Sequence, residues 1–245
     1  MKTEHIKYNA EIEDGQKIRA FVCGHTGATG KALLDTLMTS PYCESVVAVG
    51  RRENDAHKGS PKLTQQIVPN MLEICSWDPK IAKECNAAFC CIGTSFYDVF
   101  KKSKAAEYRA VDFGIATEFA KFAYRAGVQF FAVITGEGSD SSSKSNMYRV
   151  KGEVEDCVKT IGFERVAFLR PGLLNRGADA TLMERIASLG GTIGLPVSKI
   201  ADGMAWMALA QTVSVGIYSS KEIREAASML ENASGMFVKK QSPTI

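Results

Sequence analysis

Short apolar runs alternate with amphipathic stretches along most of the 245-residue chain. Six apolar runs predict strands, and their continuous apolar character is typical of parallel strands buried on both faces. They span residues 18–23, 45–49, 65–68, 87–92, 128–134 and 163–169. Apolar positions recur at helical spacing over residues 28–39, over 108–126 and from Tyr148 onward. This alternation predicts an α/β fold with a doubly wound parallel sheet.

The last third of the chain is predicted to be mainly helical. Residues 179–189 are amphipathic, and the mostly apolar run 201–217 predicts a buried helix with Asp202 as its N-cap. Ser219 and Glu222 have capping-box spacing, which predicts the start of a further helix. The tail from Ser234 is expected to fray.

Composition narrows the class of protein. A hydrophobic content of 45% supports a sizeable core, and a net charge of +3 without a basic stripe gives no reason to predict a nucleic-acid partner. The longest apolar stretch, residues 204–217, is shorter than the roughly 20 residues that span a bilayer. Seven cysteines without metal-ligand spacing indicate reduced thiols, and three scattered histidines predict no metal site. We expect a cytoplasmic protein, with a mitochondrial or membrane-peripheral location left open.

A glycine-rich loop lies between the first predicted strand and the first predicted helix. Gly24, Gly27 and Gly30 would serve a tight turn, a close approach to a pyrophosphate, and helix–strand packing. The helix N-terminus would add free N–H groups for phosphates. The spacing is G-x-x-G-x-x-G, so the strictest dinucleotide motif is not met, and a plain structural turn is the alternative. We predict dinucleotide contacts from the three glycines and from the residues between them, namely Thr26, Ala28 and Thr29.

The end of the second predicted strand indicates which dinucleotide binds. Gly50 is followed by Arg51 and Arg52, where an NAD enzyme usually has a carboxylate for the ribose 2′-hydroxyl. A guanidinium can instead hold a 2′-phosphate through two parallel hydrogen bonds. We therefore predict NADP(H), with solvated arginines as the alternative. Later strand ends would complete the cofactor wall with Cys91, Gly93, Thr94 and Pro171.

With these motifs in place, the chain resembles the atypical short-chain dehydrogenases/reductases, and more narrowly the Tat-interacting protein family of NADP-binding oxidoreductases. Four landmarks over residues 18–175 carry the resemblance. They are the 24–30 loop, the strand ends 49–52 and 89–94, and the segment 150–155 followed by Arg170-Pro171-Gly172. The resemblance implies a Rossmann fold, and the chain length predicts one such domain over residues 1–245, with a loose polar lead-in over 1–16 and substrate-side helices over about 175–245. The resemblance also implies an NADP(H) site and carbonyl or alcohol redox chemistry.

The family mechanism implies a tyrosine and a lysine four residues apart on one helix, with a serine at the preceding strand end. Here Tyr148 and Lys151 are three apart, which moves one side chain by about 100° around the helix axis. Met147 occupies the tyrosine position counted from Lys151, and Thr135 or Gly136 the serine position. The resemblance implies Tyr148 as proton donor, Lys151 as its activator and a ribose contact, and Thr135 as the partner of the substrate oxygen. A local π-bulge could restore the position of Tyr148.

Two functions remain open at this point. The first is an NADP(H)-dependent oxidoreductase that reduces a small carbonyl compound of unknown identity. The second is a non-catalytic NADP(H)-binding regulatory or structural subunit with an unknown protein partner. The glycine loop, Arg51 and Lys151 fit both functions, whereas Met147 and the missing serine favour the second.

Overall fold

The computed structural model describes residues 12–13, 15–94, 105–175 and 194–241, and its centre is a seven-stranded parallel sheet. The strand order is β3-β2-β1-β4-β5-β6-β9, and every neighbouring pair is parallel. The strands are β1 (Ile18–Cys23), β2 (Cys43–Gly50), β3 (Leu63–Ile67), β4 (Ala87–Cys90), β5 (Phe130–Ile134), β6 (Arg165–Arg170) and β9 (Val215–Ser219). The doubly wound Rossmann fold is confirmed.

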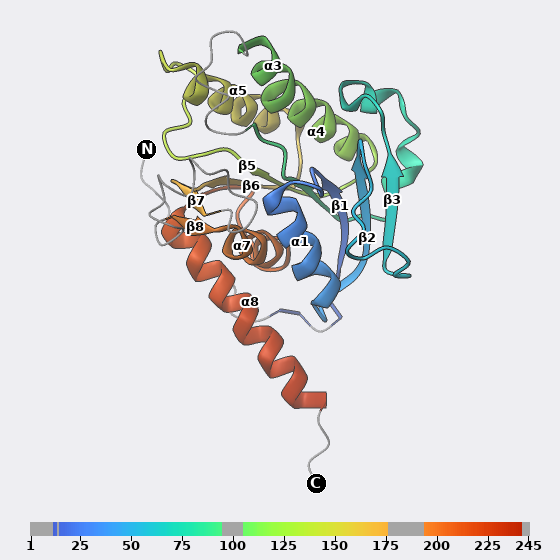
Figure 1. Cartoon of the computed structure of the whole chain (residues 1–245). Helices are drawn as coiled ribbons and strands as arrows, with labels where there is room; N and C mark the ends of the chain where they lie inside the picture. Colours follow the sequence, from blue (N-terminus) through green and yellow to red (C-terminus); the bar gives the residue numbers. More distant parts are fainter. Residues whose placement is uncertain (1–11, 14, 95–104, 176–193, 242–245) are drawn as a thin grey trace.

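Helices cover both faces of the sheet (Figure 1). On one side lie α1 (Ala28–Thr39), α7 (Val197–Ala210) and α8 (Ser220–Gln241), and on the other α3 (Ala105–Arg109), α4 (Ala116–Arg125) and α5 (Asn146–Ile161). A π turn, η4 (Ala110–Ile115), joins α3 to α4. Two 3₁₀ turns, η1 (Met71–Ser76) and η2 (Pro79–Ala82), follow β3, and β7 (Leu174–Asn175) pairs with β8 (Leu195–Pro196).

Two apolar clusters, one on each face of the sheet, form the core. All five residues of β5 are buried, as expected for a central parallel strand. On the α4 side, the rings of Phe21 and Phe119 stack at 4.9 Å between centroids. On the α7 side, Trp206 is 1% exposed. None of the helices in the described residues is long and apolar enough to cross a membrane.

The chain reverses its direction of travel across the sheet between β1 and β4. From β1 it moves outward to β2 and β3, then returns to place β4 on the other side of β1. In such sheets the ligand crevice lies at the carboxyl ends of the strands, at this reversal. The fold therefore brings the glycine loop after β1 beside the segment after β4.

The buried helix expected over residues 201–217 is wrong at both ends. The structure has α7 up to Ala210, a break at Gln211, and the edge strand β9 from Val215. Exposed and buried residues alternate along β9, which is the period of a strand rather than a helix. Asp202 lies inside α7 rather than at its N-cap, and its carboxylate accepts a 2.7 Å hydrogen bond from the Thr36 hydroxyl of α1.

Other element boundaries agree more closely. The helix expected over 108–126 begins at Ala105 and contains the π turn, and it ends before Gly127, whose φ is +87°. The capping box is confirmed, because the Ser219 N–H donates to the Glu222 carboxylate at 2.7 Å. Helix α8 continues to Gln241, beyond the fraying expected from Ser234. The helix expected over 179–189 lies outside the described residues.

Candidate functional site

A cavity of about 820 Å³ opens at the carboxyl ends of the central strands. Its wall combines the first turn of α1, the loops after β4, β5 and β6, and one face of α3–η4 and of α5. Ten of the predicted site residues line it. They are Gly27, Ala28, Thr29, Cys91, Gly93, Thr94, Thr135, Tyr148, Lys151 and Pro171. Gly24, Thr26, Gly30, Arg51 and Arg52 are not among its lining residues.

The three glycines of the loop after β1 have different surroundings. Gly24 has a φ of +83°, and a Cβ there would lie 2.7 Å from the backbone carbon of Cys91. A Cβ on Gly30 would lie 2.1 Å from the carbonyl oxygen of Gly24. Gly27 caps α1 without a side-chain hydrogen bond and faces the cavity. Gly24 and Gly30 therefore shape the turn, and Gly27 leaves the N-terminus of α1 open toward the cavity.

Arg51 and Arg52 follow β2 directly and are exposed. Within the described residues their guanidinium groups make no hydrogen bond or ion pair. The imidazole of His25, which is 1% exposed, contacts the backbone that carries the two arginines. Its Nδ1 lies 3.2 Å from the Val49 carbonyl oxygen, and its Nε2 lies 3.0 Å from that of Arg52.

Lys151 forms a shielded ion pair in the wall of the cavity. Its Nζ lies 2.7 Å from Oδ1 of Asp112, and the two side chains are 14% and 1% exposed. Oδ2 of Asp112 accepts hydrogen bonds from the Thr94 N–H at 2.9 Å and from its hydroxyl at 2.5 Å. The loop after β4, the π turn and α5 are thereby joined at one carboxylate, which orients the lysine ammonium.

Tyr148 and Met147 both line the cavity, because they begin α5 at its edge. The Tyr148 side chain is exposed, and its ring lies against Gly138, where a Cβ would be 3.2 Å from Cε1. Helix α5 is regular at this point, so no π-bulge restores the position of Tyr148. A π turn occurs in a different helix, at Ala110–Ile115.

Tyr108 is a second phenol in the cavity wall. It is 1% exposed, and its hydroxyl donates to the Met147 carbonyl at 3.2 Å. Burial, with a smaller contribution from Asp112, raises the pKa of Tyr108, so this phenol stays protonated at neutral pH.

The Thr135 hydroxyl is already committed to a buried polar cluster. It donates to Oε1 of Glu155 at 2.8 Å, with a longer contact of 3.3 Å to the Leu169 carbonyl. The Glu155 carboxylate, 1% exposed, also accepts two hydrogen bonds from the Arg170 guanidinium, at 2.8 and 2.7 Å. Thr135 can therefore offer a substrate a lone pair, while its proton serves Glu155.

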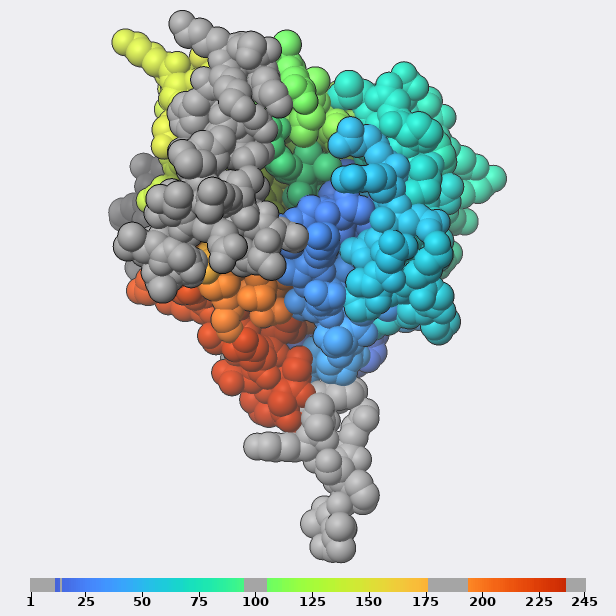
Figure 2. Space-filling view, viewed as in Figure 1, coloured from blue at the N-terminus to red at the C-terminus, as the bar shows by residue number. Residues whose placement is uncertain are grey.

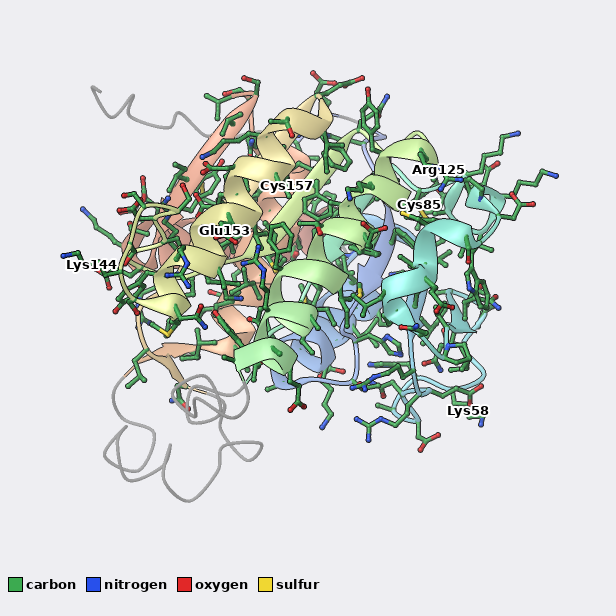
Figure 3. All side chains as sticks on the ribbon, turned by 90° about the horizontal axis from the view of Figure 1, so that it is seen from above. Lys58, Cys85, Arg125, Lys144, Glu153 and Cys157 are labelled. Carbon is green, nitrogen blue, oxygen red and sulfur yellow. The ribbon has the colours of Figure 1, made fainter. Side chains whose placement is uncertain are left out.

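The serine-rich composition of the loop over residues 139–145 is typical of a flexible segment, yet the loop packs directly on α5. The Asp140 N–H donates to the Tyr148 carbonyl at 3.0 Å, and the Ser141 hydroxyl to Asp156 at 2.6 Å. A Cβ on Gly152 would lie 2.1 Å from the Ser141 nitrogen, so glycine lets the loop touch the helix backbone. Glu153, labelled on α5 in Figure 3, forms an ion pair with Arg109 of α3.

Four of the seven cysteines are buried and the other three are partly buried. All seven are free, and burial raises the pKa of Cys90 to about 11. Cys91 lines the cavity beside Gly93. A thiol that stays protonated at neutral pH is a weak nucleophile.

Comparison with known proteins agrees with this geometry. The family model "Semialdehyde dehydrogenase, NAD binding domain" matches residues 19–136. The mitochondrial protein fmp52 of Aspergillus clavatus is 30% identical over 192 residues, covering 74% of this chain and 78% of that protein. The protein HTATIP2 of Rattus norvegicus is 29% identical over 159 residues, covering 65% and 64%.

The chain belongs to the Fmp52 and HTATIP2 family of atypical short-chain dehydrogenases/reductases.

Solved structures show the same fold. A short-chain dehydrogenase from Burkholderia cenocepacia in complex with NADP superposes with a TM-score of 0.62 at 13% identity, covering 93% of this chain and 99% of that one. MoeE5 in complex with UDP-glucose and NAD gives 0.63 at 16% identity, covering 89% and 82%. Like these neighbours, the Fmp52 and HTATIP2 family member described here has a Rossmann fold.

Sequence reasoning did not find three residues of the cavity region. Tyr108 and Asp112 both line the cavity, and they are four residues apart, so they share a face of the helix. The signal in the sequence for this site was a carboxylate within a predicted apolar helix. Glu155 is also on α5, four residues after Lys151. Its burial could not be read from the sequence, because its partner Arg170 comes from a separate strand.

Proposed function

We propose that this chain binds NADP(H) and reduces a small carbonyl compound. The observation that carries the proposal is the pair of arginines directly after β2, whose guanidinium groups have no hydrogen-bond or ion-pair partner in the described part of the chain. In Rossmann folds this position faces the adenosine ribose, where a guanidinium accommodates a 2′-phosphate and a carboxylate would repel it.

The residues present fit a dinucleotide. A cavity of about 820 Å³ is within the usual range for cofactor sites. The first turn of α1 borders it with an N-terminus that no side chain caps, which suits a pyrophosphate. At the far side, Lys151 keeps further N–H groups for ribose hydroxyls while one N–H serves Asp112.

The reduction would divide its tasks among cavity residues. NADPH would supply the hydride. Tyr148 would donate the proton to the substrate oxygen, since its hydroxyl makes no hydrogen bond within the described residues. Lys151, held by Asp112, would place a positive charge on the cofactor side of the cavity. The Thr135 oxygen would accept a hydrogen bond from the hydroxyl of the alcohol product, because its own proton is donated to Glu155.

The binding test compares NADPH with NADH, which differ only in the 2′-phosphate. We expect wild type to prefer NADPH and the double variant Arg51→Ala/Arg52→Ala to lose that preference. Lys58→Ala is a matched control, because this lysine lies in the same segment but pairs with Glu53 at 2.8 Å. An unchanged preference in the double variant would show that the phosphate assignment is wrong.

The catalytic test measures NADPH oxidation with aldehydes, ketones and quinones. Tyr148→Phe should lower kcat by 10²–10⁴-fold, roughly the contribution of general acid catalysis. Tyr124→Phe, another exposed tyrosine, is a control with no place in the cavity. Full activity in Tyr148→Phe would remove this phenol from the mechanism.

A non-catalytic NADP(H)-binding subunit is the second candidate. The specific observation in its favour is that the Thr135 proton is committed to Glu155 while Met147 stands four residues before Lys151. Tight NADPH binding without turnover of any carbonyl in the panel would favour this function over the first.

The site of action is proposed to be intracellular. The sequence favours the cytoplasm as the location of the protein. The relatives named Fmp52 are called mitochondrial, so the mitochondrion is a second location to test. Fractionation of cells expressing a tagged full chain distinguishes the two.

A further inference from the structure

The segment that carries Arg51 and Arg52 has a fixed backbone at both ends. Before them, the Gly50 carbonyl accepts the Val68 N–H at 2.9 Å. After them, the Asn54 N–H donates to Oε1 of Gln65 at 2.7 Å, and Nε2 of Gln65 returns a 3.0 Å hydrogen bond to the Asn54 carbonyl. The two guanidinium groups between these anchors make no contact of this kind within the described residues.

A third anchor holds the middle of this segment from the glycine loop. The His25 imidazole lies between the carbonyl oxygens of Val49 and Arg52, at 3.2 and 3.0 Å. The His25 carbonyl in turn accepts a 3.2 Å hydrogen bond from Nδ2 of Asn54. The turn after β2 is therefore tied to the loop that borders the cavity.

The contact between the His25 ring and the turn after β2 depends on the absence of a side chain at Gly50. A Cβ on Gly50 would lie 2.8 Å from Cε1 of His25. The ring can reach both carbonyls only because Gly50 leaves this space. His25 is 1% exposed, and both nitrogens face backbone oxygens, so the ring is not available to touch a phosphate itself.

We propose that His25 is a positioning residue for cofactor selectivity. Its imidazole holds the turn through Gly50–Arg52 in the conformation that presents the arginine side chains to the 2′-phosphate of NADP(H). This inference rests on the proposed NADP(H) function. The physical reason is preorganisation, because bidentate guanidinium–phosphate hydrogen bonds need a set orientation and a mobile loop loses affinity when it is ordered on binding.

His25→Phe removes both nitrogens and keeps a planar ring. NADH reports the integrity of the shared dinucleotide site, and NADPH reports the phosphate contact as well. We expect NADPH to bind about tenfold more weakly, which corresponds to about 1.4 kcal/mol, while NADH changes by less than about twofold. His57→Ala is the matched histidine control, since its ring pairs with Asp35 at 2.7 Å and touches neither carbonyl. The segment beside α1 that contains it is visible on the surface in Figure 2.

Gly50→Ala tests the same contact from the opposite side. The added methyl displaces the ring, and the φ of Gly50 is not positive, so alanine is compatible with the backbone. We expect the same selective loss for NADPH. This variant decides the question if His25→Phe does not fold.

The arginine background separates this inference from the proposed function. In Arg51→Ala/Arg52→Ala, the additional His25→Phe change should leave the NADPH-to-NADH ratio unaltered, because the residue acts through the arginines. A further loss in that background would mean that the ring meets the phosphate directly and would overturn the inference. Equal weakening of NADPH and NADH in the single variants would overturn it as well. If the double arginine variant alone leaves NADPH preference intact, the proposed NADP(H) function fails first.

Discussion

At the scale of single residues, two buried carboxylates organise the cavity wall. The Asp112 carboxylate pairs with the Lys151 ammonium and accepts hydrogen bonds from Thr94. The Glu155 carboxylate accepts hydrogen bonds from the Arg170 guanidinium and the Thr135 hydroxyl. A buried charge is costly unless it is paired and hydrogen-bonded, and each of these carboxylates has at least three such contacts. The two clusters fix the side chains nearest the predicted chemistry.

Lys151→Met should destabilise the protein because it leaves the Asp112 carboxylate without its cation. Breaking a buried ion pair from one side costs about 3–5 kcal/mol. Denaturant unfolding without cofactor measures the loss. Lys121→Met is the control, as its pair with Glu118 is on the surface and should contribute less than about 1 kcal/mol. Adding Asp112→Asn to Lys151→Met should recover part of the loss, and a strictly additive double variant would contradict the coupling.

His25 should make stability depend on pH. Burial lowers the pKa of His25 below its ordinary value, although the Val49 and Arg52 carbonyls act in the opposite direction. The unfolded chain therefore takes up the proton first, and stability that is fully present above about pH 6.5 is lost as the pH falls through the lowered pKa. When the pH is lowered from 7.5 to 5, the free energy of unfolding should decrease more for wild type than for His25→Gln. Equal falls would show that other groups account for the acid sensitivity.

At the scale of elements, the glycines show where helices touch other backbone. Gly152 brings α5 against the loop over residues 139–145, whose Ser139 lines the cavity. The loop composition suggested flexibility, because serine-rich stretches are flexible when nothing packs on them. The close approach to Gly152 could not be predicted, since it depends on the placement of α5 relative to the end of β5.

Gly152→Ala should push this loop away from α5. Its Cβ would meet the Ser141 nitrogen at 2.1 Å and the Asp140 carbonyl carbon at 2.3 Å. Overpacking of this kind typically costs about 1–3 kcal/mol, read as a lower denaturation midpoint. Gly235→Ala in α8 is the control, because nothing lies within 4 Å of the added atom and alanine favours a helix by up to about 1 kcal/mol. Stabilisation by both changes would contradict the packing role.

At the scale of the whole molecule, six of the seven strands of the sheet follow from the sequence pattern. The strand Ile18–Cys23 and the helix Ala28–Thr39 match their predicted bounds, because a parallel strand and an amphipathic helix leave distinct signals. The prediction for residues 201–217 was wrong because an apolar run does not by itself show where a buried helix ends and a following edge strand begins. Ten predicted site residues meet at one cavity, whereas the pairing of Lys151 with Asp112 required the tertiary structure.

Cofactor binding should stabilise the whole fold, because it joins α1, the strand ends and α5 at one cavity. At 100 times its dissociation constant, a ligand adds about 2.7 kcal/mol to the folded state. For a chain of this size that is a rise in Tm of roughly 5–10 °C. NADPH should give a larger shift than NADH at equal concentration in a thermal melt. Equal shifts would contradict the preference for the phosphorylated cofactor.

The π turn at Ala110–Ile115 has a consequence for insertions and deletions. Its hydrogen bonds span five residues rather than four, so it holds one residue more than a regular α-helical segment of the same rise. Deleting one residue there would let α3 and α4 join as a continuous α-helix of about the same rise, so the side chains on either side would keep their faces and Tyr108 would stay at the cavity. Deleting one residue from α4 would instead turn every earlier side chain by about 100° around the axis and move Tyr108 away from the cavity. The π turn is therefore the place in this helix where the loss of one residue is best tolerated.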